Sequence, residues 1–171
     1  MKIKIAILVC VFAFSSQINA QESAKNIMDN AFAQAKQENK NVFLIFHASW
    51  CGWCKKMDKQ MQSETLKPIF TKNYVTAHLT VQESKENKNL ENPGAMDIME
   101  KYNGDKAGLP FWLIFNNEGK LVANSFNDNG ENLGCPASPE EVDSFIKKLK
   151  ITSKMNDIQL AAVKEIFVIK E

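Results

Sequence analysis

Hydrophobic residues follow a strand pattern in some segments of the chain and helical spacing in the segments between them. Together the two patterns predict an α/β fold. The runs from Val42 to His47 and from Phe111 to Phe115 are almost continuously hydrophobic and rich in β-branched and aromatic residues, as is typical of buried strands. The run from Val75 to Val81 alternates between hydrophobic and polar positions, which predicts a strand with His78 on its polar face. A strand from Lys120 to Phe126 completes a hairpin with the second run.

Helical spacing of hydrophobic residues fills the segments between these strands. A first helix is expected between Glu22 and Lys40, and another is expected to end at Asn103-Gly104. Ser63 is the expected N-cap of a short helix that Pro68 breaks or displaces. The hydrophobic stripes are Ile27, Ala31, Phe32 and Ala35 in the first helix and Ala95, Ile98, Met99 and Tyr102 in the second.

Two capping boxes predict two helices near the C-terminus. Ser138 with Glu141 three residues later is the first box, and Asn156 with Gln159 repeats the spacing. Each box precedes a hydrophobic stripe, so both helices have a face to bury. The stripes are Val142, Phe145, Ile146 and Leu149 in one helix and Leu160, Val163 and Phe167 in the other.

The candidate chemistry directly follows the first buried strand, in the sequence Trp50-Cys51-Gly52-Trp53-Cys54. A strand that ends in a small-residue turn and then takes helical spacing places Cys51 at the start of a helix. The unpaired N–H groups and the helix dipole favour negative charge there and can lower a thiol pKa from about 8.5 into the neutral range. Cys54 lies one turn further on the same face, roughly 5 Å away between Cα atoms, so the pair can form a disulfide. We therefore expect Cys51 to attack a partner sulfur and Cys54 to resolve the mixed disulfide.

This Trp-Cys-Gly-X-Cys-Lys sequence after a hydrophobic strand resembles the active site of the thioredoxin family. A second block from Gly108 to Val122 is similar to the Gly-X-Pro, strand, turn and strand segment of that family. The resemblance covers residues 22–150 and implies an α/β thioredoxin-like fold, in which a central mixed β-sheet is flanked by helices. Residues 151–171 would then add a C-terminal helix beyond that core.

The resemblance implies an enzyme, a thiol-disulfide oxidoreductase that acts on protein disulfides. It also implies that the Leu109–Pro110 bond is cis, which costs little before proline, and that this edge faces the cysteine pair. Substrate proteins would dock against Trp50, Gly52, Trp53 and the Leu109–Pro110 edge. The dithiol carries two electrons itself, so no cofactor and no metal is expected. A membrane or envelope redox partner would regenerate the pair.

Two departures from the family pattern bear on proton handling and on the direction of the reaction. Many members carry a buried acid six residues before the first cysteine, where this chain has Ile45. His47, on the same strand face, is the candidate to replace it, and a histidine that only packs is the other interpretation. Gly52-Trp53 offers no cation to the Cys51 thiolate, which lowers the reduction potential and favours a reductase. Net oxidase or isomerase activity is the alternative.

Two further segments have no assigned role. The resemblance places Cys135 on a loop beside the substrate groove, where a third thiol could exchange with the pair or with a client protein. An isolated free thiol is the other interpretation. The polar segment from Glu83 to Asn92 is an insertion relative to short members of the family. It is either a solvated detour or a functional loop.

Length and charge indicate one well-buried domain. The chain has 171 residues, of which 44% are hydrophobic and 24% charged, with a net charge of +1. All its basic residues are lysines, whereas nucleic-acid-binding surfaces favour basic stripes and arginine, so no nucleic-acid partner is expected. The basic start Met1 to Lys4 and the hydrophobic run Ile5 to Phe14 predict a signal peptide over residues 1–20, cleaved after Ala20. The mature chain, 21–171, would be exported to the periplasm or secreted, without stable membrane insertion; an uncleaved anchor is the alternative.

The residues leave two other classes of function open. A metal-binding protein could hold zinc or copper with Cys51, Cys54 and either Cys135 or His47, although a clear second cysteine pair is missing. In a binding module the pair could instead be a purely structural disulfide. Metal analysis of the reduced protein and the response of the pair to mild reductant separate these alternatives from an oxidoreductase.

Overall fold

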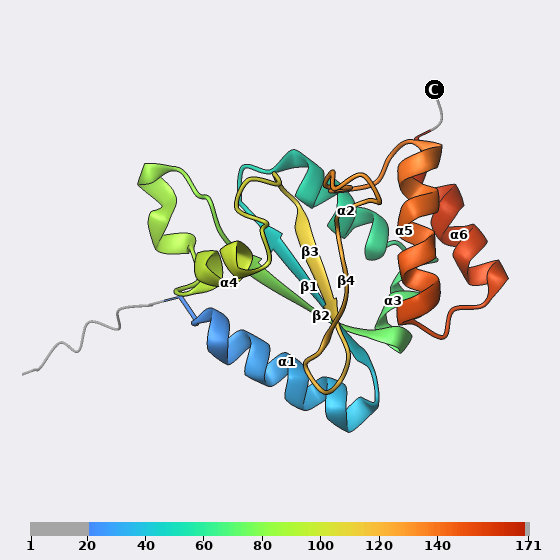
Figure 1. Cartoon of the computed structure of the whole chain (residues 1–171), viewed down its shortest axis with the longest axis horizontal. Helices are drawn as coiled ribbons and strands as arrows, with labels where there is room; N and C mark the ends of the chain where they lie inside the picture. The colour runs from blue at the N-terminus through green and yellow to red at the C-terminus, as the bar shows by residue number, and fades with distance from the viewer. Residues whose placement is uncertain (1–20, 170–171) are drawn as a thin grey trace, which may run out of the picture.

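The computed structural model describes residues 21–169, so the expected signal peptide at residues 1–20 lies outside the described residues. A twisted four-stranded sheet runs through the centre of Figure 1, with helices on both of its faces. Every helix of the described part is too short or too polar to cross a membrane. In chain order the elements are α1 (Ala24–Glu38), β1 (Asn41–His47), α2 (Gly52–Met61), α3 (Lys67–Asn73), β2 (Tyr74–Thr80), the 3₁₀ helix η1 (Lys85–Leu90), α4 (Ala95–Lys101), β3 (Phe111–Phe115), β4 (Leu121–Asn124), α5 (Pro139–Thr152) and α6 (Asp157–Phe167).

The sheet has the order β2-β1-β3-β4 and is mixed. Strand β1 runs parallel to β2 and antiparallel to β3, and β3 pairs antiparallel with β4. The central strands β1 and β3 are covered on both faces, which explains their continuous hydrophobic runs, whereas β2 at the edge alternates in burial. Strand β4 is shorter than predicted, because after Asn124 only an isolated bridge between Phe126 and Asn132 continues the pairing. The predicted mixed sheet flanked by helices is confirmed.

Successive residues of β1 enter two separate cores. Phe43 and Ile45 pack in a cluster with residues of α2, α3, α5 and α6. Val42, Leu44 and Phe46 face the other way, into a cluster with α1 and α4. Figure 1 shows this layering, with α1 below the sheet on one side and α5 and α6 together on the other. Helix α2, which carries Cys54, therefore follows a strand that is packed on both faces.

Both predicted capping boxes are present. The Ser138 hydroxyl accepts from the Glu141 N–H, and the Glu141 carboxylate accepts from the Ser138 N–H in return. Asn156 and Gln159 make the same reciprocal pair at the start of α6. The C-terminal helix α6 buries its predicted stripe against α5 and forms the extension beyond the family core.

The short helix after α2 starts later than predicted, so Ser63 is not its N-cap. Ser63 accepts from the Leu66 N–H within a preceding turn, and α3 begins at Lys67 with Pro68 in its first turn. Proline is tolerated there because its missing N–H has no helical partner in the first turn. The polar segment after β2, for which no element was predicted, contains the 3₁₀ helix η1.

Candidate redox site

A disulfide joins Cys51 and Cys54 at the start of α2. Cys51 is the N-cap of the helix, and its sulfur accepts a hydrogen bond from the Cys54 N–H at 3.1 Å. The two Cα atoms are 5.3 Å apart, as the spacing predicts for two positions on one helical face. Both residues are almost fully buried, at 3% and 2% exposure. The structure thus holds the pair in its oxidised state at a helix start suited to a thiolate.

The proline loop lies against the pair. The Leu109–Pro110 bond is cis, and Leu109 packs on the small cluster that Ala48 forms with the two cysteines. Asn132 fixes this loop, since its side-chain N–H groups donate to the carbonyls of Ala107, Gly108 and Pro110. Asn132 lies far along the chain in a polar loop, and the spacing patterns gave no indication of this role.

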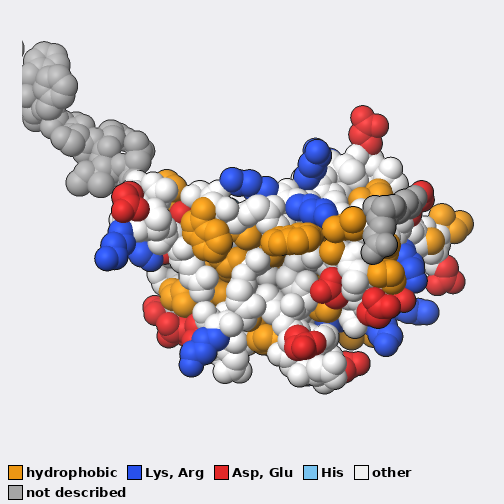
Figure 2. Space-filling view, turned by 90° about the horizontal axis from the view of Figure 1, so that it is seen from above, with side chains coloured by type: hydrophobic (Ala, Val, Ile, Leu, Met, Phe, Trp, Pro, Cys, Tyr) orange, Lys and Arg blue, Asp and Glu red, His pale blue; other side chains and the backbone are white. Residues whose placement is uncertain are grey.

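Two tryptophans border the disulfide. Trp50 and Trp53 are 58% and 51% exposed, and the Trp50 indole N–H donates to the Gln82 carbonyl at 2.8 Å. The Lys56 ammonium lies over the Trp53 ring, 4.9 Å from its centroid. Figure 2 views the end of the molecule where α2 begins and shows hydrophobic side chains gathered across the middle of that face, with lysines beside them. The two exposed tryptophan rings thus give the pair a hydrophobic border.

A hollow of about 430 Å³ opens beside this surface. It lies between Trp53, the proline loop and the loop that leads into α5. Its lining brings together segments that are distant in sequence. The lining residues are Trp53, Ala107, Gly108, Leu109, Asn132, Leu133, Gly134, Cys135, Ala137, Ser138 and Glu141.

His47 of β1, His78 of β2 and Asp58 of α2 form a polar cluster where the helix packs beside these strands. The His47 and His78 rings meet edge to face at 5.3 Å, His78 pairs with Asp58 at 2.9 Å, and His47 contacts the Thr80 hydroxyl at 3.2 Å. Burial lowers the pKa of His47 and His78 adds to this, while Asp58 and Glu83 oppose it. His78, on the polar face of its strand, therefore has side-chain partners in both Asp58 and His47. Asp58, one turn after Cys54, was not singled out from the sequence.

Cys135 lines the hollow beside the proline loop, where the resemblance placed it, but its side chain is almost fully buried. It is 6% exposed, and its thiol donates to the Gln60 side-chain oxygen of α2 at 3.3 Å. Burial raises the pKa of this thiol to about 11, and the Glu141 and Asp58 carboxylates also raise it, against Lys56. Since the thiolate is the reactive form, these surroundings favour the free-thiol interpretation.

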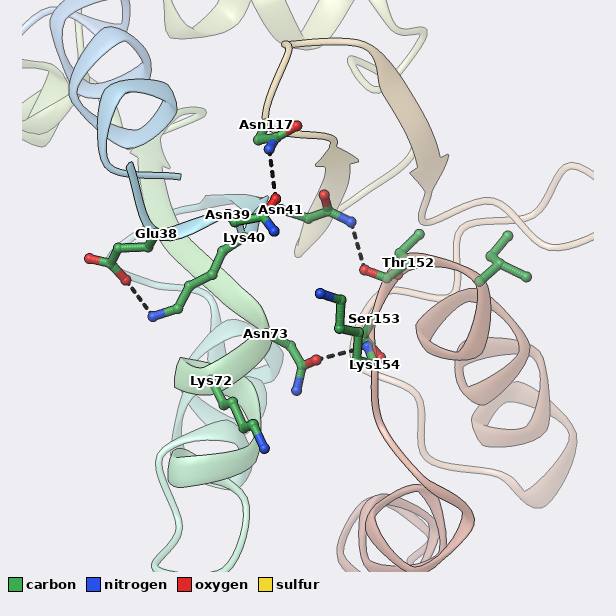
Figure 3. A pocket seen from close by; sticks show the side chains of 11 residues that line it. Glu38, Asn39, Lys40, Asn41, Lys72, Asn73, Asn117, Thr152, Ser153 and Lys154 are labelled. Carbon is green, nitrogen blue, oxygen red and sulfur yellow. Dashed lines mark hydrogen bonds and ion pairs between the residues drawn. The ribbon is translucent and has the colours of Figure 1, made fainter. Parts of the chain in front are cut away.

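A polar hollow at the opposite end of the sheet is the one drawn in Figure 3. Its amides are occupied with one another and with the backbone: Asn41 donates to the Thr152 carbonyl, and Asn73 accepts from the Lys154 N–H. These bonds tie the end of α5 to β1 and α3. The hollow therefore lies where these elements are held together, at the end of the sheet away from the Cys51–Cys54 disulfide.

No group of three His, Cys, Asp or Glu side chains within residues 21–169 is arranged to hold a metal ion. The third ligands of the metal alternative are engaged elsewhere, because Cys135 bonds to Gln60 and His47 to Thr80.

The fold and the disulfide at the helix start define the class of thioredoxin-like thiol-disulfide oxidoreductases. A family model described as thioredoxin-like matches residues 23–117, more than half of the chain, and the chain belongs to this family.

Individual relatives match shorter stretches. Protein disulfide-isomerase A5 of Mus musculus is 42% identical over 41 residues, which are 24% of this chain and 8% of that protein. Protein disulfide-isomerase 1 of Dictyostelium discoideum is 30% identical over 74 residues, 42% of this chain and 20% of that protein. This chain therefore matches only a small part of these curated relatives. A disulphide isomerase from Xylella fastidiosa Temecula1 has a TM-score of 0.52 at 17% identity, over 91% of this chain and 93% of that one, which shows a shared fold.

Proposed function

We propose that this protein reduces protein disulfides by thiol-disulfide exchange. The observation that carries the proposal is the Cys51–Cys54 disulfide, formed at the first turn of α2 against the cis-proline loop. A dithiol in this place can give up two electrons without a cofactor.

The exchange runs in two balanced steps. The Cys51 thiolate attacks one sulfur of a substrate disulfide, forms a mixed disulfide and releases the other substrate sulfur as a thiolate, which takes up a proton. Cys54, as thiolate, then attacks the Cys51 sulfur and releases the second substrate thiol. The substrate has gained two electrons and two protons, and the protein is left in the oxidised state of the structure. A dithiol partner in the envelope, acting as electron donor, returns it to the reduced state.

The lack of a cationic residue between the two cysteines supports the reductase direction. Gly52-Trp53 separate the cysteines, and the nearby Lys56 ammonium is stacked over the Trp53 ring. A less stabilised thiolate means a less stable reduced form and a lower reduction potential. Isomerase or oxidase activity is the second candidate, because the relatives named above are described as disulfide isomerases.

Substrate proteins would bind across the hydrophobic surface of Trp50 and Trp53 and along the hollow beside Leu109–Pro110. The backbone edge next to the cis-proline and the exposed rings offer contacts that suit many sequences, which fits a general protein substrate. The leader-like start of the chain supports an exported protein that works in the periplasm or outside the cell.

Equilibration of the Cys51–Cys54 pair with glutathione tests the direction. A potential near that of thioredoxin, about −270 mV, supports the reductase, and a value near −120 mV reverses the direction to oxidase. A pair that never exchanges with glutathione or with a protein disulfide would leave the structural-disulfide alternative.

A further inference from the structure

A buried carboxylate stands beside the turn that carries the redox pair and has no part in the exchange steps. Glu83 is 5% exposed, and its two oxygens accept both donors of Ser49, the backbone N–H and the hydroxyl, the latter at 2.7 Å. Ser49 precedes Cys51 by two residues, so their Cα atoms are within about 8 Å of each other. Glu83 therefore faces the turn that leads into α2.

The residue before Glu83 contacts the residue after Ser49. Gln82 accepts the indole N–H of Trp50 at 2.8 Å through its carbonyl, and its backbone has the left-handed φ of 53°. Few non-glycine residues adopt this conformation. Two adjacent residues, Gln82 and Glu83, thus hold two adjacent residues, Trp50 and Ser49.

The segment that presents Glu83 is closed at its base. Asn92 and Thr80 exchange two hydrogen bonds, with the Thr80 N–H donating to the Asn92 side chain at 2.7 Å and the Asn92 N–H donating to the Thr80 carbonyl at 3.1 Å. The Glu91 carboxylate accepts from the Glu83 N–H at 2.8 Å and pairs with Lys88 at 2.7 Å. The insertion is therefore an ordered arm that fixes Glu83, and a solvated detour would not need these bonds.

The charge of Glu83 acts on the His47 ring, whose pKa it raises against the effect of burial. None of the ion pairs found among residues 21–169 includes Glu83. Two like unit charges about 10 Å apart, at an effective dielectric constant of about 20, change an equilibrium constant roughly tenfold. A carboxylate at this place disfavours a thiolate at the start of α2.

We propose that Glu83 is a positioning residue that holds the Ser49–Trp50 turn and, through its charge, makes the Cys51–Cys54 pair a stronger reductant. The inference rests on the proposed reductase function. It also supplies an acid near the pair from a different segment, in a chain that has Ile45 at the position where many family members have one. Because the carboxylate disfavours the Cys51 thiolate, the reduced form gives up its electrons more readily.

The Glu83→Gln variant tests this, because glutamine keeps the shape and removes the charge. Its oxygen can still accept the Ser49 N–H, and its NH2 group can donate to the Ser49 hydroxyl oxygen. In equilibrium with glutathione, the variant should shift about tenfold toward its reduced form, which for two electrons is about 30 mV. In the reduced protein, the pH profile of Cys51 alkylation should move to lower pH. The matched control is Glu86→Gln, on the same arm but exposed, and both measurements should stay at the wild-type values.

An unchanged glutathione equilibrium and alkylation profile in a folded Glu83→Gln protein would overturn the inference. So would equal shifts in Glu83→Gln and Glu86→Gln, since a general loss of negative charge would then suffice. If the wild-type pair does not exchange at all, the proposed function fails. The alkylation profile then still decides whether Glu83 acts on Cys51, because alkylation needs no disulfide exchange.

Discussion

Helix α2 borders two sulfur sites with opposite surroundings. At its first turn the Cys51 sulfur is the cap that accepts a backbone N–H, and the helix end favours negative charge. Near its last turn Gln60 accepts a hydrogen bond from Cys135, and burial raises the pKa of that thiol to about 11. The Cys51 sulfur accepts a hydrogen bond, whereas the Cys135 thiol donates one. The role of a cysteine near this site is therefore set by the direction of its hydrogen bond as much as by its position.

The largest effect is expected from removing the sulfur at the first turn of α2. Cys51→Ala should abolish reduction of protein disulfides, because no nucleophile remains at the helix start. Cys135→Ala, the matched variant at the other sulfur, should keep the wild-type rate. An insulin reduction assay with both variants measures this. Equal losses in the two proteins would contradict the assignment of Cys135 as an inert thiol.

The next effect concerns the packing around the Cys135 end. Phe167 is fully buried in α6, and its ring packs on Phe145 at 5.3 Å. Phe167→Ala should lower the free energy of unfolding by about 3–5 kcal/mol through the lost contacts and the cavity. Ile158→Ala on the exposed side of the same helix should change it by less than about 0.5 kcal/mol. Urea unfolding gives both values, and the reduction potential of the folded Phe167→Ala protein should equal that of the wild type.

The smallest effect compares the two sulfurs directly. The Cys135 pKa of about 11, against an ordinary 9.0, leaves about 100-fold less thiolate near pH 8 in the native protein than in the unfolded chain. Since a raised thiol pKa delays deprotonation, alkylation of native Cys135 should be slow at pH 8 and accelerate only as the pH approaches 11. Peptide mapping after a timed pulse of iodoacetamide, with and without urea, gives the ratio. Alkylation of native Cys135 as fast as that of Cys51 would contradict the prediction.

The sequence predicted the elements whose residues act locally. Capping boxes and hydrophobic stripes involve positions three or four apart, so α5 and α6 could be placed with their caps. The cysteine pair was found for the same reason, since its spacing within one helical turn already implies its geometry. The prediction that Ser63 is the N-cap of α3 was wrong, because a serine that caps a turn has the same local sequence pattern as one that caps a helix.

Contacts between distant segments could not be predicted this way. Glu83 meets Ser49 across 34 positions, and Asn132 reaches the proline loop from 22 to 25 positions away. Their side chains lie in polar stretches where most residues are solvated, and periodicity carries no information on which of them turns inward. Cys135 was placed near the groove by resemblance, but its burial depends on how α2 and the loop before α5 pack together.

The cap of α2 differs in kind from the oxygen caps of the neighbouring helices. Ser23, Ser138 and Asn156 start α1, α5 and α6 with atoms whose chemical state is constant, whereas the cap of α2 is the sulfur that reacts. A thiolate accepts a charge-assisted hydrogen bond that a disulfide sulfur does not. The hydrogen bond at the first turn of α2 is therefore stronger in the reduced protein than in the oxidised one. The NMR chemical shift of the Cys54 amide then reports what fraction of the molecules is reduced.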